Sequence, residues 1–241
     1  MTCALCKQER ELRRSHIIPE FLYTQIYDSI HRYLSVSTNP AHREQRLWKG
    51  ERERLLCASC EQKLGGWEDY AKKAFLDGKG VKISRLGSRI NFERFCYSSF
   101  RLFLLSLLWR MGISDLESYK AVSLGPHEEK LRLALMSANP LDPGEYPVVL
   151  VAALINGEFH PQWMMSPSLG RMEGLRCYCP VIEGVLFYFF VGSHALPPTL
   201  RALPLNLRGE MGMLIEDIQR LTVLKDLGER ISWARLQRSK R

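Results

Sequence analysis

The segment Cys3-Ala4-Leu5-Cys6, taken together with Cys57-Ala58-Ser59-Cys60, decides the fold of the N-terminal part of this chain. A two-residue gap lets both sulfurs of a turn reach one ion, and two such pairs complete the tetrahedral ligand set of a structural zinc site. We therefore predict one structural Zn²⁺ bound by the four cysteines. Because the pairs stand far apart in the sequence, a β-hairpin or loop must lie between them. The N-terminal segment that contains the two pairs is polar and buries little core. A zinc site can supply on the order of 10 kcal/mol to the folding of such a segment.

The composition is that of a globular protein with a basic charge balance. The chain has 241 residues, a formal net charge of +8 and a sequence pI of about 9.2. Such a balance favours a polyanionic partner. The N-terminus lacks the apolar run of a secretory signal, and the apolar run Phe103–Trp109 is too short to cross a bilayer. We expect a cytoplasmic protein that does not enter a membrane, in which Cys96, Cys177 and Cys179 pack in the core.

The hydrophobic pattern predicts an α+β fold in two parts. The bridge Asp77-Gly78-Lys79-Gly80 is typical of a turn or short linker. It separates a zinc-binding module, residues 1–78, from an α+β domain of unknown function, residues 81–241. In the second part the pattern predicts helices and then an antiparallel sheet of three or four strands. The expected helices are Asn91–Gly112, a shorter one capped by Ser114 and Asp115, one from Pro126 to Met136, and one from about residue 209 to the C-terminus. The expected strands are Tyr146–Ile155, Arg176–Ile182 and Val185–Val191, with turns at Asn156-Gly157 and Glu183-Gly184.

A second set of residues suggests chemistry beside the zinc site. Arg13-Arg14-Ser15-His16-Ile17-Ile18-Pro19 lies between the cysteine pairs, and Glu61 follows Cys60 directly. The order of a CxxC pair, a His-Ile-x-Pro element and a Leu-Cys-x-x-Cys that opens a helix resembles the zinc-containing HNH (His-Me finger) endonucleases. It is also similar to uncharacterised bacterial proteins that carry SHIIP and LLCxxCE. The resemblance covers roughly residues 1–70.

This resemblance implies a ββα-metal, treble-clef-like module and a hydrolytic role for two residues. His16 matches the position of the general base, which takes a proton from water. Glu61 stands where such nucleases place a ligand of a catalytic Mg²⁺ or Mn²⁺, and Glu68 lies one helical repeat further on the same face. A hard cation of this kind accepts carboxylate ligands. Two departures from the pattern are Ser15, where many of these enzymes have an acidic residue or histidine, and the absence of asparagine from Arg52–Leu56. His16 could therefore instead be a structural histidine.

Basic and aromatic residues cluster around the same segment. Their side chains could neutralise phosphates and stack a base. The expected nucleic-acid contacts are Arg13, Arg14, Arg46, Trp48, Lys49 and Arg54. Because Glu44, Glu51 and Glu53 are interspersed among them, the segment could equally be a solvated face of mixed charge. A second basic cluster, Arg235, Arg238, Lys240 and Arg241, ends the chain.

Three hypotheses about function follow from these residues. The first is a metal-dependent endonuclease that hydrolyses nucleic-acid phosphodiesters, with DNA and RNA equally open. The second is a non-catalytic nucleic-acid-binding or adaptor protein that retains the zinc scaffold with a degenerate HNH site. The third is an interaction module that binds a protein partner through residues 81–241.

Overall fold

The N-terminal part of the computed structural model consists of two antiparallel strands and a long helix. The structure describes residues 1–35, 44–76, 78 and 80–221. Strand β1 (Leu12–His16) pairs with β4 (Arg52–Cys57), and helix α1 (Ala58–Leu76) begins at the next residue. The register sets the last residue of β1, His16, opposite Arg52. The junction of β4 and α1, at Cys57, lies opposite Leu12 at the start of β1.

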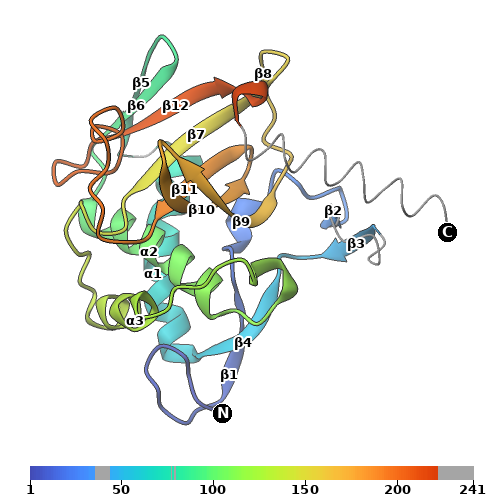
Figure 1. The fold of residues 1–241 in the computed structure, drawn as a ribbon. Helices are drawn as coiled ribbons and strands as arrows, with labels where there is room; N and C mark the ends of the chain where they lie inside the picture. The colour runs from blue at the N-terminus through green and yellow to red at the C-terminus, as the bar shows by residue number, and fades with distance from the viewer. Residues whose placement is uncertain (36–43, 77, 79, 222–241) are drawn as a thin grey trace.

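A hairpin occupies the segment between the cysteine pairs, as predicted. After the 3₁₀ turn η1 (Glu20–Tyr23), strands β2 (Arg32–Ser35) and β3 (Gln45–Trp48) form a separate two-stranded sheet. Figure 1 shows this hairpin projecting from the body of the molecule. It therefore presents a face that the main core does not cover.

The rest of the described chain is built on an eight-stranded sheet. Its strand order is β5-β6-β12-β7-β11-β10-β9, with the short β8 beside β7. All neighbouring strands are antiparallel except β12 and β7, which run parallel. The strands are β5 (Lys82–Leu86), β6 (Arg89–Glu93), β7 (Val148–Ile155), β8 (Glu158–Phe159), β9 (Met165–Met172), β10 (Leu175–Ile182), β11 (Val185–Phe190) and β12 (Met211–Asp217).

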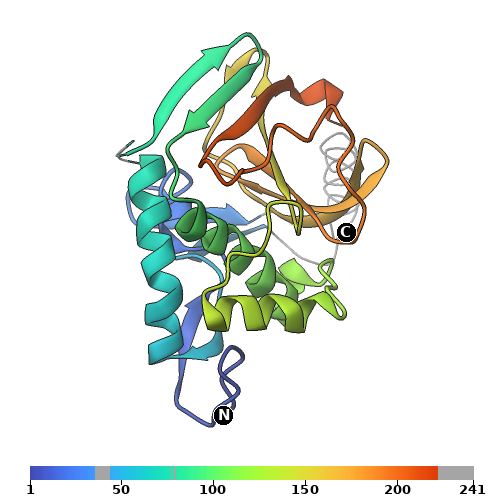
Figure 2. The ribbon, with the colours of Figure 1, turned by 90° about the vertical axis from the view of Figure 1, so that its left-hand side faces the viewer.

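Helices cover one face of this sheet, and an irregular segment covers the other. Helices α2 (Tyr97–Ile113) and α3 (His127–Ser137) lie with α1 below the sheet in Figure 2. Along β7 the side chains alternate between the two faces, as strand geometry requires. Val148 and Leu150 join the core with α2, whereas Val149 and Val151 join a second cluster that includes Leu196, Leu200 and Leu203.

Residues from both predicted parts of the chain share the first of these cores. Leu56 of β4 and Leu64 of α1 lie in the same cluster as Phe103 and Leu107 of α2. None of the described helices is long and apolar enough to cross a bilayer. Helix α2 is apolar around most of its girth because it is buried between α1, α3 and the sheet.

Several elements match the sequence prediction. Strands β7, β10 and β11 and helix α3 lie where the pattern placed them, and the Asn156-Gly157 and Glu183-Gly184 turns join β7 to β8 and β10 to β11. The mixed α and β content is confirmed. Cys177 and Cys179 are buried on β10 as expected.

The predicted helix over Asn91–Gly112 is wrong in its first part. Residues up to Glu93 belong to β6, which pairs with β5 and β12. Arg94 then has a φ of +73°, which a right-handed helix cannot accommodate, and α2 begins only at Tyr97. Cys96 consequently precedes the helix and is exposed rather than packed in the core. The pairing of β6 with a strand more than a hundred residues away overrode the local pattern.

Two further helix predictions and the size of the sheet need correction. The segment after Ser114 and Asp115 forms only a 3₁₀ turn, η2 (Glu117–Tyr119), without a side-chain cap. The expected C-terminal helix is replaced over its first residues by β12 and the 3₁₀ turn η3 (Ile218–Arg220), and its remainder, with the basic cluster, lies outside the described residues. The sheet has eight strands because β5, β6, β8, β9 and β12 join the three predicted ones.

Candidate metal centre and adjoining acid–base cluster

The four cysteines of the two CxxC pairs meet at one point. Their sulfur atoms all lie within 4.8 Å of one another, and Cys6 Sγ is 3.9 Å from Cys57 Sγ. Cys3 and Cys6 come from the N-terminal turn, Cys57 ends β4, and Cys60 lies in the first turn of α1. Four thiols so placed form a site for a metal ion, as the sequence predicted. None of the seven cysteines is in a disulfide.

The surroundings of the thiols shift their pKa values in opposite directions. The Cys57 backbone N–H donates to Cys3 Sγ at 3.3 Å. The Ser59 hydroxyl, 3.3 Å from Cys57 Sγ, is the main cause that lowers the pKa of Cys57 to about 6. Burial instead raises the pKa of Cys60 and of Cys6. A cation bound between the four sulfurs would offset the cost of burial and favour the thiolates.

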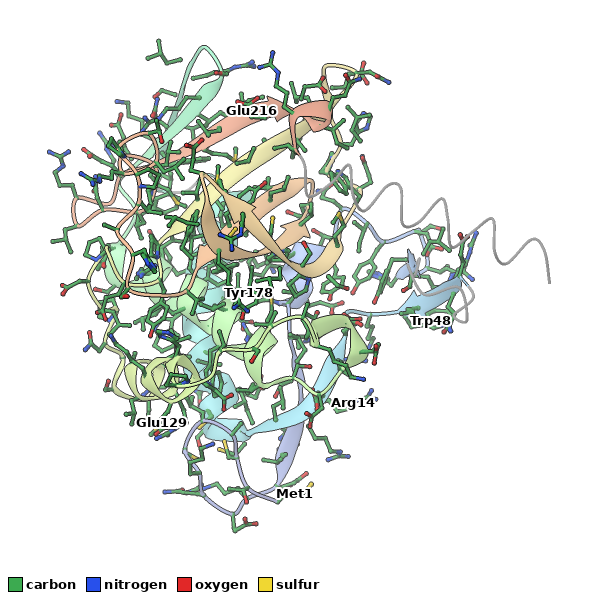
Figure 3. All side chains as sticks on the ribbon, in the orientation of Figure 1. Met1, Arg14, Trp48, Glu129, Tyr178 and Glu216 are labelled. Carbon is green, nitrogen blue, oxygen red and sulfur yellow. The ribbon has the colours of Figure 1, made fainter. Side chains whose placement is uncertain are left out.

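The metal-binding turn is also held by α3. Arg132 Nη1 donates to the Leu5 backbone oxygen at 2.6 Å, and Glu129 holds the same guanidinium at 2.7 Å. Glu129 is labelled in Figure 3 beside α3. Residues far along the chain thus fix the loop that carries Cys3 and Cys6.

His16 lies at the end of β1 with a carboxylate as its partner. Its Nε2 is 2.6 Å from Glu20 Oε2, an ion-pair contact between two buried atoms, neither of which forms a hydrogen bond with the described chain. Tyr27 donates its hydroxyl to Glu20 Oε1 at 2.9 Å. Burial lowers the pKa of His16, and the negative charge of Glu20 opposes this effect. The imidazole is therefore neutral near pH 7, and one of its nitrogens faces a carboxylate.

Glu61 lies in the first turn of α1 and turns its carboxyl toward β1. The buried Ser15 Oγ accepts from the Leu56 backbone N–H at 3.2 Å, and the same hydroxyl acts on the Glu61 carboxyl so as to lower its pKa. Burial raises the pKa of Glu61, against the opposing influence of Ser15 and of Arg110. Its Oε1 is buried and has no hydrogen-bond partner in the part of the chain that is described. An unsatisfied buried oxygen of this kind requires an explanation.

Glu68 is bound by an arginine from α2. Arg110 Nη2 is 2.7 Å from Glu68 Oε1, and Arg110 Nη1 donates to the His16 backbone oxygen at 2.9 Å. The Arg110 side chain is only 2% exposed. Its Nε and Nη2 also approach the backbone and side-chain oxygens of Ser106 at 3.4 Å. One guanidinium therefore joins α1, α2 and the end of β1.

The structure brings together the three residues that the sequence proposed for chemistry. The charge of Glu68 acts on both His16 and Glu61, so the three lie in one electrostatic cluster. They do not form a tight ligand set. Apart from the four cysteines, no group of three or more His, Cys, Asp or Glu in the described ranges has its ligand atoms within 4.8 Å of one another.

The residues expected to touch nucleic acid all lie on exposed positions of three strands. Arg13 and Arg14 are on β1, Arg54 is on β4, and Arg46, Trp48 and Lys49 are on or next to β3. Figure 3 labels Arg14 near β1 and β4 and Trp48 on the projecting hairpin. Arg54 donates to the Leu12 backbone oxygen at 3.1 Å, so its guanidinium helps to stabilise the pairing of β1 with β4.

Sequence reasoning missed Glu20 and Arg110. Glu20 stands four residues after His16, and a carboxylate at that spacing was a signal that could have been noticed. Arg110 ends an apolar run, and a charge in a buried helix must find a buried partner. The identity of that partner could not be deduced, because 94 residues separate Arg110 from His16.

A cavity of about 440 Å³ lies elsewhere, lined by β6 and by the loop that leads into β12. Its lining includes Arg89, Asn206 and Glu210 and none of the cysteines or candidate catalytic residues. Comparison of the chain with protein-family models, curated proteins and solved structures gives no match. What can be concluded about function therefore comes from the residues of the chain itself.

Proposed function

We propose that this protein is a metal-dependent endonuclease-like hydrolase of nucleic-acid phosphodiesters, built on a ββα-metal, treble-clef-like module. The observation that supports it best is the position of His16. It ends β1, faces Glu20, and lies in one electrostatic cluster with Glu61 and Glu68 of α1. The order of β1, β4 and α1 around four clustered thiols is the arrangement expected from the HNH resemblance.

Structural zinc is the metal that fits the four thiols. Four cysteine sulfurs within 4.8 Å of one another supply the closed tetrahedral set that structural zinc sites use. The site fastens the N-terminal turn to the junction of β4 and α1. That junction positions Glu61 one residue after Cys60, so the zinc site orders the neighbouring acid–base cluster.

His16 is the proposed general base. The Glu20 carboxylate lies 2.6 Å from Nε2, so we assign the uptake of a proton from water to the other ring nitrogen, Nδ1. Burial keeps the imidazole neutral near pH 7, which is the form that acts as a base. Glu20 then stabilises the imidazolium that forms, as the carboxylate does in other carboxylate–histidine pairs.

Glu61 is the proposed ligand of a catalytic Mg²⁺ or Mn²⁺. Its buried Oε1 lacks a partner and its pKa is raised by burial, so a bound cation would satisfy the oxygen and favour the carboxylate. A Mg²⁺ ion commonly uses one or two protein carboxylates together with substrate phosphate and water. When bound, such an ion stabilises the charge that develops on the phosphate oxygens. Glu68 fits this role less well, because Arg110 already holds it.

The test is cleavage of plasmid, single-stranded DNA and RNA by zinc-loaded protein with Mg²⁺ or Mn²⁺. We expect cleavage by the wild type and loss of cleavage in His16→Ala and Glu61→Gln. His31→Ala is the matched control, because His31 is an exposed histidine of the neighbouring loop. Zinc content and circular dichroism must be unchanged in all variants. Equal cleavage by wild type and His16→Ala would show that His16 is structural.

A second function, non-catalytic nucleic-acid binding or an adaptor role, is supported by one specific observation. Arg110 holds Glu68 at 2.7 Å, and in the described chain Glu61 belongs to no group of three or more metal-ligating side chains. A site reduced in this way would retain the zinc scaffold without hydrolysis. Nucleic-acid binding without cleavage of any of the three substrates would favour this alternative.

A further inference from the structure

The β2–β3 hairpin carries cations and apolar side chains alternately on one face. Arg32 lies opposite Trp48, and Leu34 lies opposite Arg46. Since side chains of a strand alternate between faces, these four share the same side of the hairpin. Trp48 is 63% exposed and Leu34 is 57% exposed. Large apolar side chains exposed together next to cations indicate a binding surface more often than isolated ones do.

The opposite face anchors the hairpin to the protein. Tyr33 points to this side, with its ring 5.7 Å from that of Tyr23 and 6.2 Å from that of Tyr27. Tyr23 is buried in the main core. The hairpin is thus fixed through one face and free on the face that carries Trp48, which agrees with its projection in Figure 1.

The Trp48 ring is held in place by an ordered arginine. The Arg32 guanidinium lies 5.6 Å from the centre of the Trp48 ring. Asp28 holds this guanidinium through Nε and Nη2, both at 3.0 Å from Oδ2. A cation over an indole ring is a favourable contact that fixes the ring. Most of the indole surface nevertheless remains in solvent, as a preformed platform would require.

The platform adjoins the candidate site along the chain. Trp48 precedes Arg52 by four residues, and Arg52 lies opposite His16 in the β1–β4 pair. Four residues span at most about 14 Å. A nucleic-acid strand seated on Trp48 can therefore reach His16 within a few nucleotides.

We propose that Trp48 stacks an unpaired base, so that the substrate is single-stranded or locally unpaired nucleic acid. This inference rests on the proposed function and names its substrate class. A flat aromatic side chain beside cations binds single strands because every base has a face to stack, whereas in a duplex the neighbouring bases cover those faces. Arg46 and Lys49 supply positive charge for the backbone next to the ring.

The test measures binding of fluorescently labelled oligonucleotides to the full zinc-loaded protein. A His16→Ala background prevents cleavage during the measurement. The probes are a mixed-sequence DNA strand, its duplex, and the RNA strand of the same sequence. The variants are Trp48→Ala, the aromatic replacement Trp48→Phe, and Leu34→Ala as the control on the same face.

We expect tighter binding of the single strands than of the duplex. Trp48→Ala should weaken single-strand binding between about 5-fold and 150-fold, the range for loss of one base–aromatic stack. Its effect on the duplex should be smaller, and Trp48→Phe should retain most of the affinity. Leu34→Ala should change binding by less than Trp48→Ala. Comparison of the DNA and RNA strands then distinguishes the two sources of unpaired bases.

Three outcomes would overturn the inference. They are an equal loss on duplex and single strand, no loss in Trp48→Ala, and no binding of any probe. The experiments separate failure of the Trp48 platform from failure of the proposed hydrolysis. Trp48-dependent binding by a wild type that cleaves nothing supports the platform and rejects hydrolysis. Cleavage that is unaffected by Trp48→Ala, with no preference for single strands, supports hydrolysis and rejects the platform.

Discussion

Arg110 of α2 lies 2.7 Å from Glu68 of α1 and donates to the backbone oxygen of His16, although its side chain is almost completely buried. The residue therefore connects the region after residue 80 to the end of β1. Removing one partner of a buried ion pair is costly, because it leaves an uncompensated charge and unsatisfied acceptors. The N-terminal acid–base cluster thus depends on a side chain from a distant part of the sequence.

Replacing Arg110 should destabilise the protein strongly. We expect Arg110→Ala to lower the free energy of unfolding by about 3 kcal/mol, the lower end of the range for breaking a buried pair, since Glu68 keeps some contact with solvent. Urea denaturation measures the effect. The control is Arg13→Ala, whose exposed contact with Glu11 at 3.9 Å should be worth less than about 1 kcal/mol. Equal effects of the two substitutions would contradict the connecting role of Arg110.

Removal of metal from the cysteine site should unfold the N-terminal part of the chain. The four thiols are closely grouped, and binding of a structural ion at such a site supplies on the order of 10 kcal/mol to folding. Chelation, or Cys57→Ser, should therefore expose residues 1–75 to protease and reduce the circular dichroism signal.

Cys96→Ser is the matched control for the cysteine substitution, because Cys96 is exposed and does not belong to the cluster. It should leave metal content and protease resistance unchanged. Unaltered circular dichroism and protease resistance after verified loss of metal would show that packing alone holds the segment.

The cysteine site could be predicted from sequence because its geometry is encoded locally. The gap within each CxxC pair already constrains two sulfurs to one ion, so only the meeting of the pairs was a long-range inference. The Asn156-Gly157 turn marked a hairpin for the same reason. Strands β6 and β12 could not be recognised, since their apolar spacing also suits a helix and only their mutual pairing decides between the two.

In the candidate site, too, the residues next to a local motif could be predicted and those positioned by distant contacts could not. His16 and Glu61 were identified because each stands at a fixed offset from a motif. The partner of Glu68 was not, because the sequence position of Arg110 gives no indication of which carboxylate it meets. Burial of charged groups is decided by tertiary packing, so residues that act through buried ion pairs escape local reasoning.

Loss of the Glu20 charge should lower the pKa of His16 further. Burial lowers this pKa, and the negative charge of Glu20 acts against it. In Glu20→Gln the opposing charge is gone, so protonation of the imidazole should require a lower pH than in the wild type. NMR titration of the His16 ring, assigned by its absence in His16→Gln, measures the shift.

Glu11→Gln serves as the control for this titration, because Glu11 is exposed, directly precedes β1 and contacts Arg13 instead. It should leave the titration of His16 almost unchanged. An unchanged or raised pKa of His16 in Glu20→Gln would contradict the pairing of His16 with Glu20 at 2.6 Å.

Glu183 should make the stability of the protein fall as pH rises toward neutrality. Its carboxyl, at the turn between β10 and β11, has a pKa raised to about 7 by burial, against opposing hydrogen bonds from the Thr24 side chain and the Gln25 backbone. In the unfolded chain a glutamate ionises near pH 4.5. Between these values the folded state binds more protons than the unfolded state, so the free energy of unfolding decreases as pH rises through this window. Each pKa unit corresponds to about 1.4 kcal/mol, and for a carboxyl in partial contact with solvent we expect a total loss of about 1–2 kcal/mol.

Urea denaturation from pH 4.5 to 8 measures this loss, as the difference in the free energy of unfolding between wild type and Glu183→Gln. The variant should gain stability relative to wild type as pH rises, whereas Glu158→Gln, at an exposed position of β8, should not. Parallel pH profiles of wild type and Glu183→Gln would show that Glu183 ionises normally in the folded protein.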